Sequence, residues 1–109
     1  MNKTKRTRLE ARGWRVGSAE DFLGLTPEEA AFVEARLALS HALRARRLAQ
    51  GITQAELARR LKSSQSRVAK MEAGDKTVSV DLLVRALFSL GAKPRDVGRA
   101  LQRRGGTAA

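Results

Sequence analysis

The chain has 109 residues, a length that suits one domain with a single hydrophobic core. It carries 22 Lys and Arg against 11 Asp and Glu, and the formal net charge of +11 predicts a polyanionic partner, whether DNA, RNA, an anionic membrane or an acidic protein. The absence of cysteine excludes disulfides and thiolate metal sites. No apolar run is long enough for a membrane-spanning helix or a secretory signal, so a cytoplasmic protein is the simplest interpretation.

The charges change sign along the chain. A basic start gives way to a mainly acidic stretch that ends near residue 36, and the chain is basic again from residue 44 onward. On this pattern we expect three parts: a basic N-terminal arm over residues 1–19, a helical domain over 20–92 and a basic C-terminal helix and tail over 93–109.

Helix signals are dense, and the first one lies just after the acidic stretch begins. Thr26-Pro27-Glu28-Glu29 is a capping box with proline at the first helical position, where its missing N–H is harmless. No helix breaker follows until Gly51. The sequence therefore predicts a long helix from about Pro27 to Gln50.

Two short helices are predicted next. Thr53-Gln54-Ala55-Glu56 is a second capping box and opens a helix that ends near Leu61. Ser64 is a suitable cap for a helix from Gln65 to Ala73, which Gly74 terminates in a left-handed conformation.

The last two helices are bounded by serine, glycine and proline. Ser79 caps a helix from Val80 to Leu90, which Gly91 closes, and Pro94 begins a fifth helix that is weakened by Gly98 and frayed by Gly105-Gly106. Strand signals are poor. The predicted fold class is all-α: a compact bundle of about five helices with a basic N-terminal arm.

The two short helices and their three-residue turn have the organisation of a helix-turn-helix. Apolar residues recur where the two helices would meet the core, and Ala58 is small enough to let them cross closely. The residues expected in the core are Leu57, Ala58, Leu61, Val68 and Met71, completed by Leu43, Ile52, Leu82, Leu83 and Leu87.

The opposite face of the second short helix holds only hydrogen-bond donors and no acid: Gln65, Ser66, Arg67 and Lys70. Glutamine can bond an adenine edge, and arginine or lysine can reach guanine in the major groove. The cap region with Lys62 and Ser64, and Lys76 beyond the helix, can contact phosphate. An ordinary solvated helix could look similar, but the capping, spacing and local charge together favour DNA reading.

Three segments resemble the Cro/repressor (XRE-type) helix-turn-helix: Ile52–Ala58, Ser64–Val68 and Met71–Gly74, within a matching stretch from about residue 43 to residue 91. The resemblance implies that Gln54 binds a backbone phosphate, and that Arg47 and Glu72 form an ion pair that ties the long helix to the DNA-reading helix. Breaking such a pair, if it is buried, could cost about 3–5 kcal/mol.

One position departs from that family's pattern. The turn residue that is usually glycine is Lys62 here, and a left-handed conformation at a lysine would cost roughly 1 kcal/mol.

The segment before the motif, residues 19–29 followed by Arg36-Leu37-Ala38-Leu39, is similar to antitoxins of the HigA type. This resemblance implies repression of the protein's own operon and neutralisation of a RelE/HigB-like ribonuclease toxin. Such toxins are commonly basic, so the acidic stretch is a candidate docking surface, with candidate residues Trp14, Glu20, Asp21, Phe22 and Leu23. The aromatic cluster can equally be a hydrophobic staple that folds the arm onto the core.

The sequence thus predicts a dimeric transcriptional repressor that binds double-stranded operator DNA. Dimerisation is expected because one short helix reads too few bases, and Val80–Leu90 and Arg95–Leu101 are the candidate dimer surfaces. The alternatives are a free-standing regulator without a toxin, or a protein-interaction module with vestigial DNA binding. We expect no enzyme activity, metal or cofactor, because the chain has no P-loop and no nucleophile elbow, and its one histidine, His41, lacks companion ligands.

Overall fold

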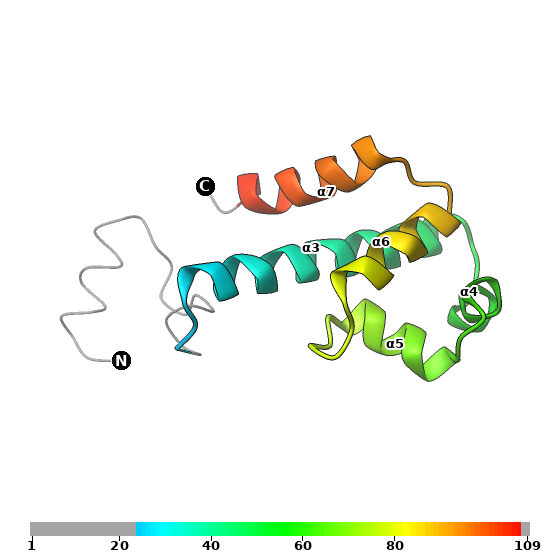
Figure 1. Cartoon of the computed structure of the whole chain (residues 1–109). Coiled ribbons are helices and arrows are strands. Elements are labelled where there is room, and N and C mark those ends of the chain that lie inside the picture. The colour runs from blue at the N-terminus through cyan, green and yellow to red at the C-terminus, as the bar shows by residue number, and fades with distance from the viewer. Residues whose placement is uncertain (1–23, 108–109) are drawn as a thin grey trace. The chain divides into compact units, whose positions relative to one another are not determined.

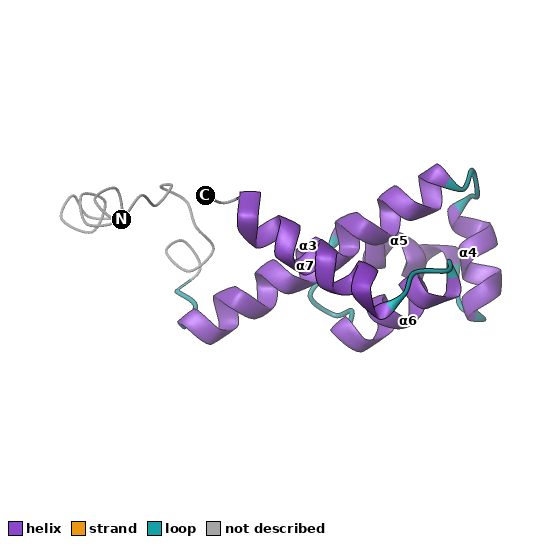
Figure 2. Cartoon of the chain, turned by 90° about the horizontal axis from the view of Figure 1, so that it is seen from above, coloured by secondary structure: helices purple, strands orange, loops and turns teal. Residues whose placement is uncertain are grey.

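The computed structural model describes residues 24–107, with side chains through residue 102. This part of the chain contains helices and no strand, so the predicted all-α class is confirmed (Figures 1 and 2). The helices are α3 (Pro27–Ala49), α4 (Gln54–Leu61), α5 (Gln65–Ala73), α6 (Val80–Ser89) and α7 (Pro94–Thr107). None of them has the length and apolarity required to cross a membrane.

Side-chain caps begin the helices where the sequence predicts them. Thr26 and Glu29 form a reciprocal capping box, in which Glu29 N donates to Thr26 Oγ1 at 3.1 Å and Thr26 N donates to Glu29 Oε1 at 2.8 Å. Thr53, Ser64 and Ser79 accept the backbone N–H three residues on, at distances of 3.0, 3.2 and 3.1 Å. Each cap satisfies one of the donors that a helix start leaves without a partner.

The chain divides into two units, residues 1–33 and residues 34–109. Of the first unit, the structure describes residues 24–33, which contain the start of α3. The second unit contains the rest of α3 and all of α4 to α7. The arm predicted over residues 1–19 lies outside the described residues.

The core of the second unit is formed by leucine, valine and methionine from α3 to α6. The predicted core residues Leu43, Leu57, Ala58, Val68, Met71, Leu83 and Leu87 are all buried, while Ile52, Leu61 and Leu82 are partly buried against them. Leu39, Leu90 and Val78 join this core. In Figure 1, α5 and α7 lie on opposite sides of the layer formed by α3 and α6.

The turn between α4 and α5 contains a left-handed residue at the position where the family pattern usually has glycine. Lys62 adopts φ 54° and ψ 49°, and no other residue in the described part except glycine has a positive φ. Ser63 N then donates to Ala58 O at 2.8 Å, which closes the end of α4. The cost of placing lysine there is about 1 kcal/mol.

The last helix continues further than the sequence indicates. α7 passes through Gly98 and extends across Gly105-Gly106 to Thr107. Asp96 supports its start, because one carboxylate oxygen accepts from Lys93 N at 2.8 Å. This bond lowers the pKa of Asp96, and the nearby Arg46, Arg99 and Arg95 lower it further.

Candidate nucleic-acid interface

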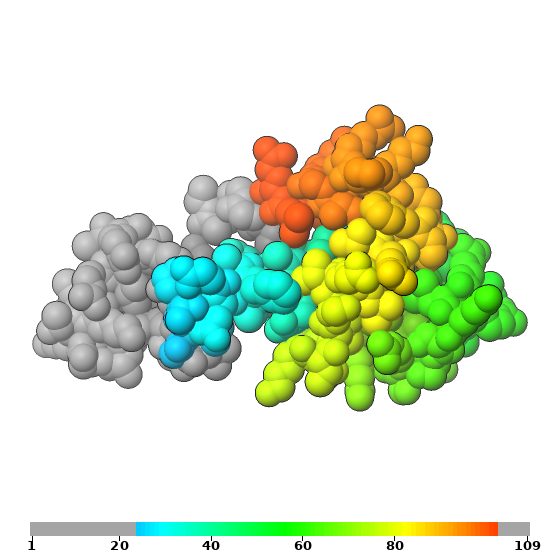
Figure 3. Space-filling view, in the orientation of Figure 1, coloured from blue at the N-terminus to red at the C-terminus, as the bar shows by residue number. Residues whose placement is uncertain are grey.

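The buried side of α5 fixes which of its residues face outward. Val68 and Met71 are fully buried, three residues apart, so the other side of this helix is turned to solvent. The four residues expected to read bases, Gln65, Ser66, Arg67 and Lys70, are all exposed there. In the space-filling view, side chains of this part of the chain (yellow-green) project beyond α6 (yellow) (Figure 3).

A hollow of about 240 Å³ lies beside the exposed side of α5. Its lining combines hydroxyl groups with two cations: Ser64, Ser66, Arg67, Lys70, Thr77 and Val78. The hydroxyl oxygens of Ser64 and Ser66 lie 3.2 Å apart, within hydrogen-bond distance. Hydroxyl and cationic groups together can donate hydrogen bonds to phosphate oxygens or to base edges.

The loop after α5 is ordered by an acidic side chain, Asp75, that was not among the predicted site residues. Asp75 Oδ1 accepts from Thr77 N at 2.7 Å and from Thr77 Oγ1 at 2.5 Å. These two bonds lower the pKa of Asp75, the side-chain bond most, and the charges of Lys70 and Lys76 lower it further. The signal was present in the sequence, because an aspartate two residues before a threonine is typical of an Asx turn.

Arg47 joins three elements at the inner side of the motif. Its Nε and Nη2 donate to the two carboxylate oxygens of Glu72 at 2.5 and 2.9 Å, and its Nη1 donates to Ile52 O at 2.9 Å. The side chains of Arg47 and Glu72 are only 9% and 3% exposed. The bond to Glu72 raises the pKa of Arg47, and the pair ties the end of α3 to α5.

Gln54, the residue implied to bind phosphate, takes part in the same network. Its Nε2 donates to Glu72 Oε1 at 3.2 Å, which engages one of its two N–H groups. Gln54 is partly buried, and the structure gives its side chain no second hydrogen bond among the described residues. Lys62, Ser64 and Lys76, the other candidate phosphate contacts, are all exposed.

The end of α5 approaches α3 at Gly74. This residue has φ +73°, and a Cβ atom added to it would lie 2.5 Å from Leu37 Cδ2. Glycine therefore serves both the left-handed helix end and the close contact.

The candidate toxin-binding residues Trp14, Glu20, Asp21, Phe22 and Leu23 lie outside the described residues.

Across residues 24–107, no group of histidine and acidic side chains is arranged to hold a metal ion. The described residues of the site are hydrogen-bond donors, cations and one inward-facing ion pair.

Neither the curated proteins nor the solved structures give a match to this chain. Residues 43–93, just under half of the chain, match a family model described as helix-turn-helix. The matched residues run from the buried Leu43 of α3 through α4, α5 and α6. The match supports the XRE-type helix-turn-helix family for this segment and, with it, a DNA-binding transcriptional regulator.

Proposed function

We propose that this protein is a transcriptional repressor that inserts α5 into the major groove of an operator. The single observation that carries the proposal is the outward face of α5, where Gln65, Ser66, Arg67 and Lys70 are exposed donors. Glu72, the only acid of α5, is turned inward and held by Arg47, so it does not repel DNA. A helix fixed on its inner side by a buried core and a charged pair is suited to reading base edges.

We further propose that the repressor is a cytoplasmic homodimer. Two copies of α5 related by a two-fold axis would read half-sites one helical turn apart, about 34 Å, which doubles the sequence that is read. Of the two candidate dimer surfaces, α6 has the more apolar exposed side, with Phe88 44% exposed and Val84 partly buried. That composition supports α6, because the centres of homodimer interfaces are apolar.

The most specific proposal is that the repressor is an antitoxin with a small basic toxin as its partner. The acidic start of α3 supports it, because Glu28, Glu29 and Glu34 are all exposed there in a chain that is otherwise strongly basic. Co-expression with the product of the neighbouring small gene tests this. If that product neither binds nor is neutralised, a free-standing regulator is the better description.

The DNA-binding proposal is tested with Arg67→Ala and Lys70→Ala. Each should weaken operator binding by about 1–3 kcal/mol if the side chain contacts a base, while affinity for random duplex changes less. Arg44→Ala is a matched control, because Arg44 is an exposed arginine of α3 outside both α5 and the proposed dimer surface.

Two outcomes of a mobility-shift assay would change the proposal. An equal loss on operator and random DNA would reassign the residue to a phosphate contact. No binding of the unmodified chain to its own promoter, or a flat response to salt, would leave the protein-interaction module as the better function.

A further inference from the structure

A second basic surface lies far from α5. Figure 1 shows α7 on the other side of the α3 and α6 layer, and in Figure 3 its side chains (orange) form the edge opposite to the yellow-green α5 segment. One straight DNA duplex in contact with α5 therefore does not reach α7 on the same protomer.

The charge of this surface is almost entirely of one sign. From residue 93 to residue 107 the sequence has five cations and one acid: Lys93, Arg95, Arg99, Arg103 and Arg104 against Asp96. Lys93 and Arg95 are exposed and have no ion-pair partner within the described residues, and the side chain of Arg99 is 62% exposed. The surface thus presents unneutralised positive charge to solvent.

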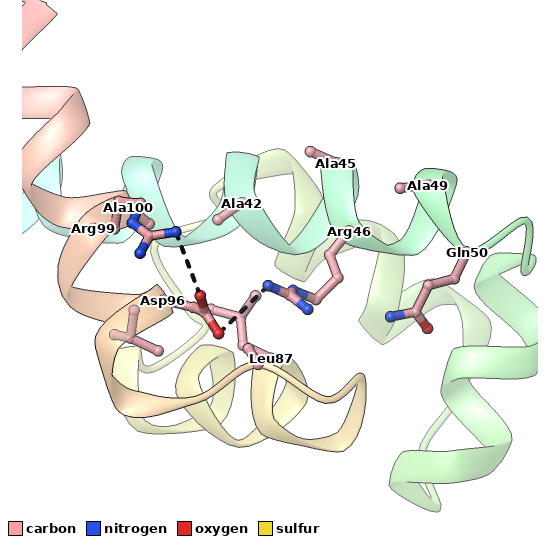
Figure 4. Close-up of a pocket in the computed structure, with 11 residues that line it drawn as sticks. Ala42, Ala45, Arg46, Ala49, Gln50, Leu87, Asp96, Arg99 and Ala100 are labelled. Carbon is pink, nitrogen blue, oxygen red and sulfur yellow. Dashed lines mark ion pairs between the residues drawn. The ribbon is translucent and has the colours of Figure 1, made fainter.

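The single acid is already occupied. Asp96 accepts from Lys93 N at 2.8 Å, and its carboxylate lies 3.8 Å from both Arg46 of α3 and Arg99 (Figure 4). Its side chain is 25% exposed. Asp96 therefore anchors the first turn of α7 and contributes little repulsion to an approaching anion.

The spacing of the arginines arranges them along one side of the helix. Residues 95 and 99 are four apart, so they lie one turn apart on the same side of the helix, with a rise of about 6 Å between them. The inner side of α7 is set by Val97, which packs against the core, and by Ala100, which faces a hollow beside α3 (Figure 4). Arg95 is exposed on the outer side, and Arg99, whose side chain is 62% exposed, lies at the rim of the hollow beside α3, where it pairs with Asp96.

We propose that the exposed cations at the start of α7, Lys93, Arg95 and Arg99, are a second, sequence-independent surface for the phosphate backbone of duplex DNA, so that the protein holds a second DNA segment while α5 occupies its operator. The holding of two segments rests on the proposed function, whereas the affinity of α7 for DNA does not. Arg95 and Arg99 suit phosphates, because the guanidinium group forms bidentate bonds to phosphate oxygens. An acidic protein is less suited to this surface, because protein interfaces have an apolar centre and Leu101, at 39% exposure, is the only large apolar side chain exposed on α7.

The first test measures DNA binding by the α7 surface alone, in a chain whose α5 surface is disabled by Arg67→Gln and Lys70→Gln. This variant should still bind a short duplex of unrelated sequence in a salt-dependent manner. Adding Arg95→Gln and Arg99→Gln should lower the slope of log affinity against log salt by about two, because each phosphate contact contributes about 0.9. These side chains are exposed, so thermal unfolding should be unchanged.

The matched control removes the same net charge elsewhere, with Arg44→Glu at an exposed arginine of α3. The control should keep the slope. An equal fall in both variants would mean that diffuse net charge, and not α7, binds DNA, and would overturn the proposal. So would the absence of any binding by the α5-disabled chain, or competition by poly-glutamate as effective as by duplex at equal charge.

The second test asks whether two segments are held at once. Operator DNA on beads is loaded with the otherwise unmodified chain, and capture of a labelled second duplex is measured. Arg95→Gln with Arg99→Gln should abolish capture while operator affinity is retained, and unchanged capture would refute the bridging role. The proposed function is tested separately, by measuring whether the unmodified chain prefers operator to random DNA.

Discussion

The ion pair between Arg47 and Glu72 gives the sharpest prediction about what holds α5 in place. Glu72→Ala removes the acceptor of two bonds from Arg47, at 2.5 and 2.9 Å, and of one from Gln54 at 3.2 Å. Arg47, which is 7% exposed as a whole residue, then keeps only its bond to the carbonyl of Ile52 at 2.9 Å. A buried guanidinium without its counter-charge is strongly unfavourable.

The expected loss in the free energy of unfolding is about 3–5 kcal/mol. Because domains of this size are stable by only about 5–15 kcal/mol, the variant should be close to partial unfolding. Urea unfolding followed by far-UV circular dichroism measures the loss by linear extrapolation. Glu56→Ala is the matched control, since Glu56 pairs with Arg59 and Arg60 at the surface with its side chain 33% exposed, and it should lose less than about 1 kcal/mol.

Replacement of both partners separates the charge from the packing. Arg47→Met with Glu72→Leu removes the buried charges together, and it should recover most of the stability lost by Glu72→Ala. If Glu72→Ala and Glu56→Ala lose equal stability, the pair does not hold α5 and the reasoning fails. If the double replacement is as unstable as Glu72→Ala, the loss comes from packing and the explanation by unpaired charge is wrong.

Two backbone positions give further predictions. Lys62→Gly should stabilise the protein by about 0.5–1 kcal/mol in urea unfolding, because glycine removes the cost of the left-handed backbone conformation. Lys62→Ala should give no such gain. An equal gain in both variants would mean that the loss of the lysine charge, and not the backbone conformation, causes the stabilisation. Gly74→Ala should destabilise by about 1 kcal/mol more than Gly51→Ala, because both residues have φ near +70° but only Gly74 meets another side chain, that of Leu37; equal losses would mean that Leu37 moves aside freely.

The helix bounds could be predicted because the signals that set them are local. Thr53, Ser64 and Ser79 each cap a helix through a bond to the backbone three residues on, which the sequence alone specifies. The exposed face of α5 was predictable for a similar reason, since Val68 and Met71 fix its inner side by their spacing.

Features that depend on a distant partner could not be predicted from the residues alone. The bond from Gln54 to Glu72 spans 18 positions, and the bond from Gln50 Nε2 to Leu90 O spans 40. The continuation of α7 across two glycines is another case, because propensity measures only the local cost of glycine. The Arg47–Glu72 contact itself was expected only through the family resemblance.

Two successive residues of α3, Arg46 and Arg47, contact the two helices that carry the basic surfaces. Arg47 binds Glu72 of α5, while Arg46 lies 3.8 Å from Asp96 of α7. The α3 layer between the surfaces is at least one helix thick, about 10–12 Å. Repulsion between exposed charges is largely screened beyond about 8 Å at physiological salt. Two DNA segments, one on each side, would therefore repel each other only weakly, and the repulsion should grow as salt is lowered. Since the phosphate contacts of both surfaces strengthen under the same change, simultaneous binding should be most efficient at intermediate salt.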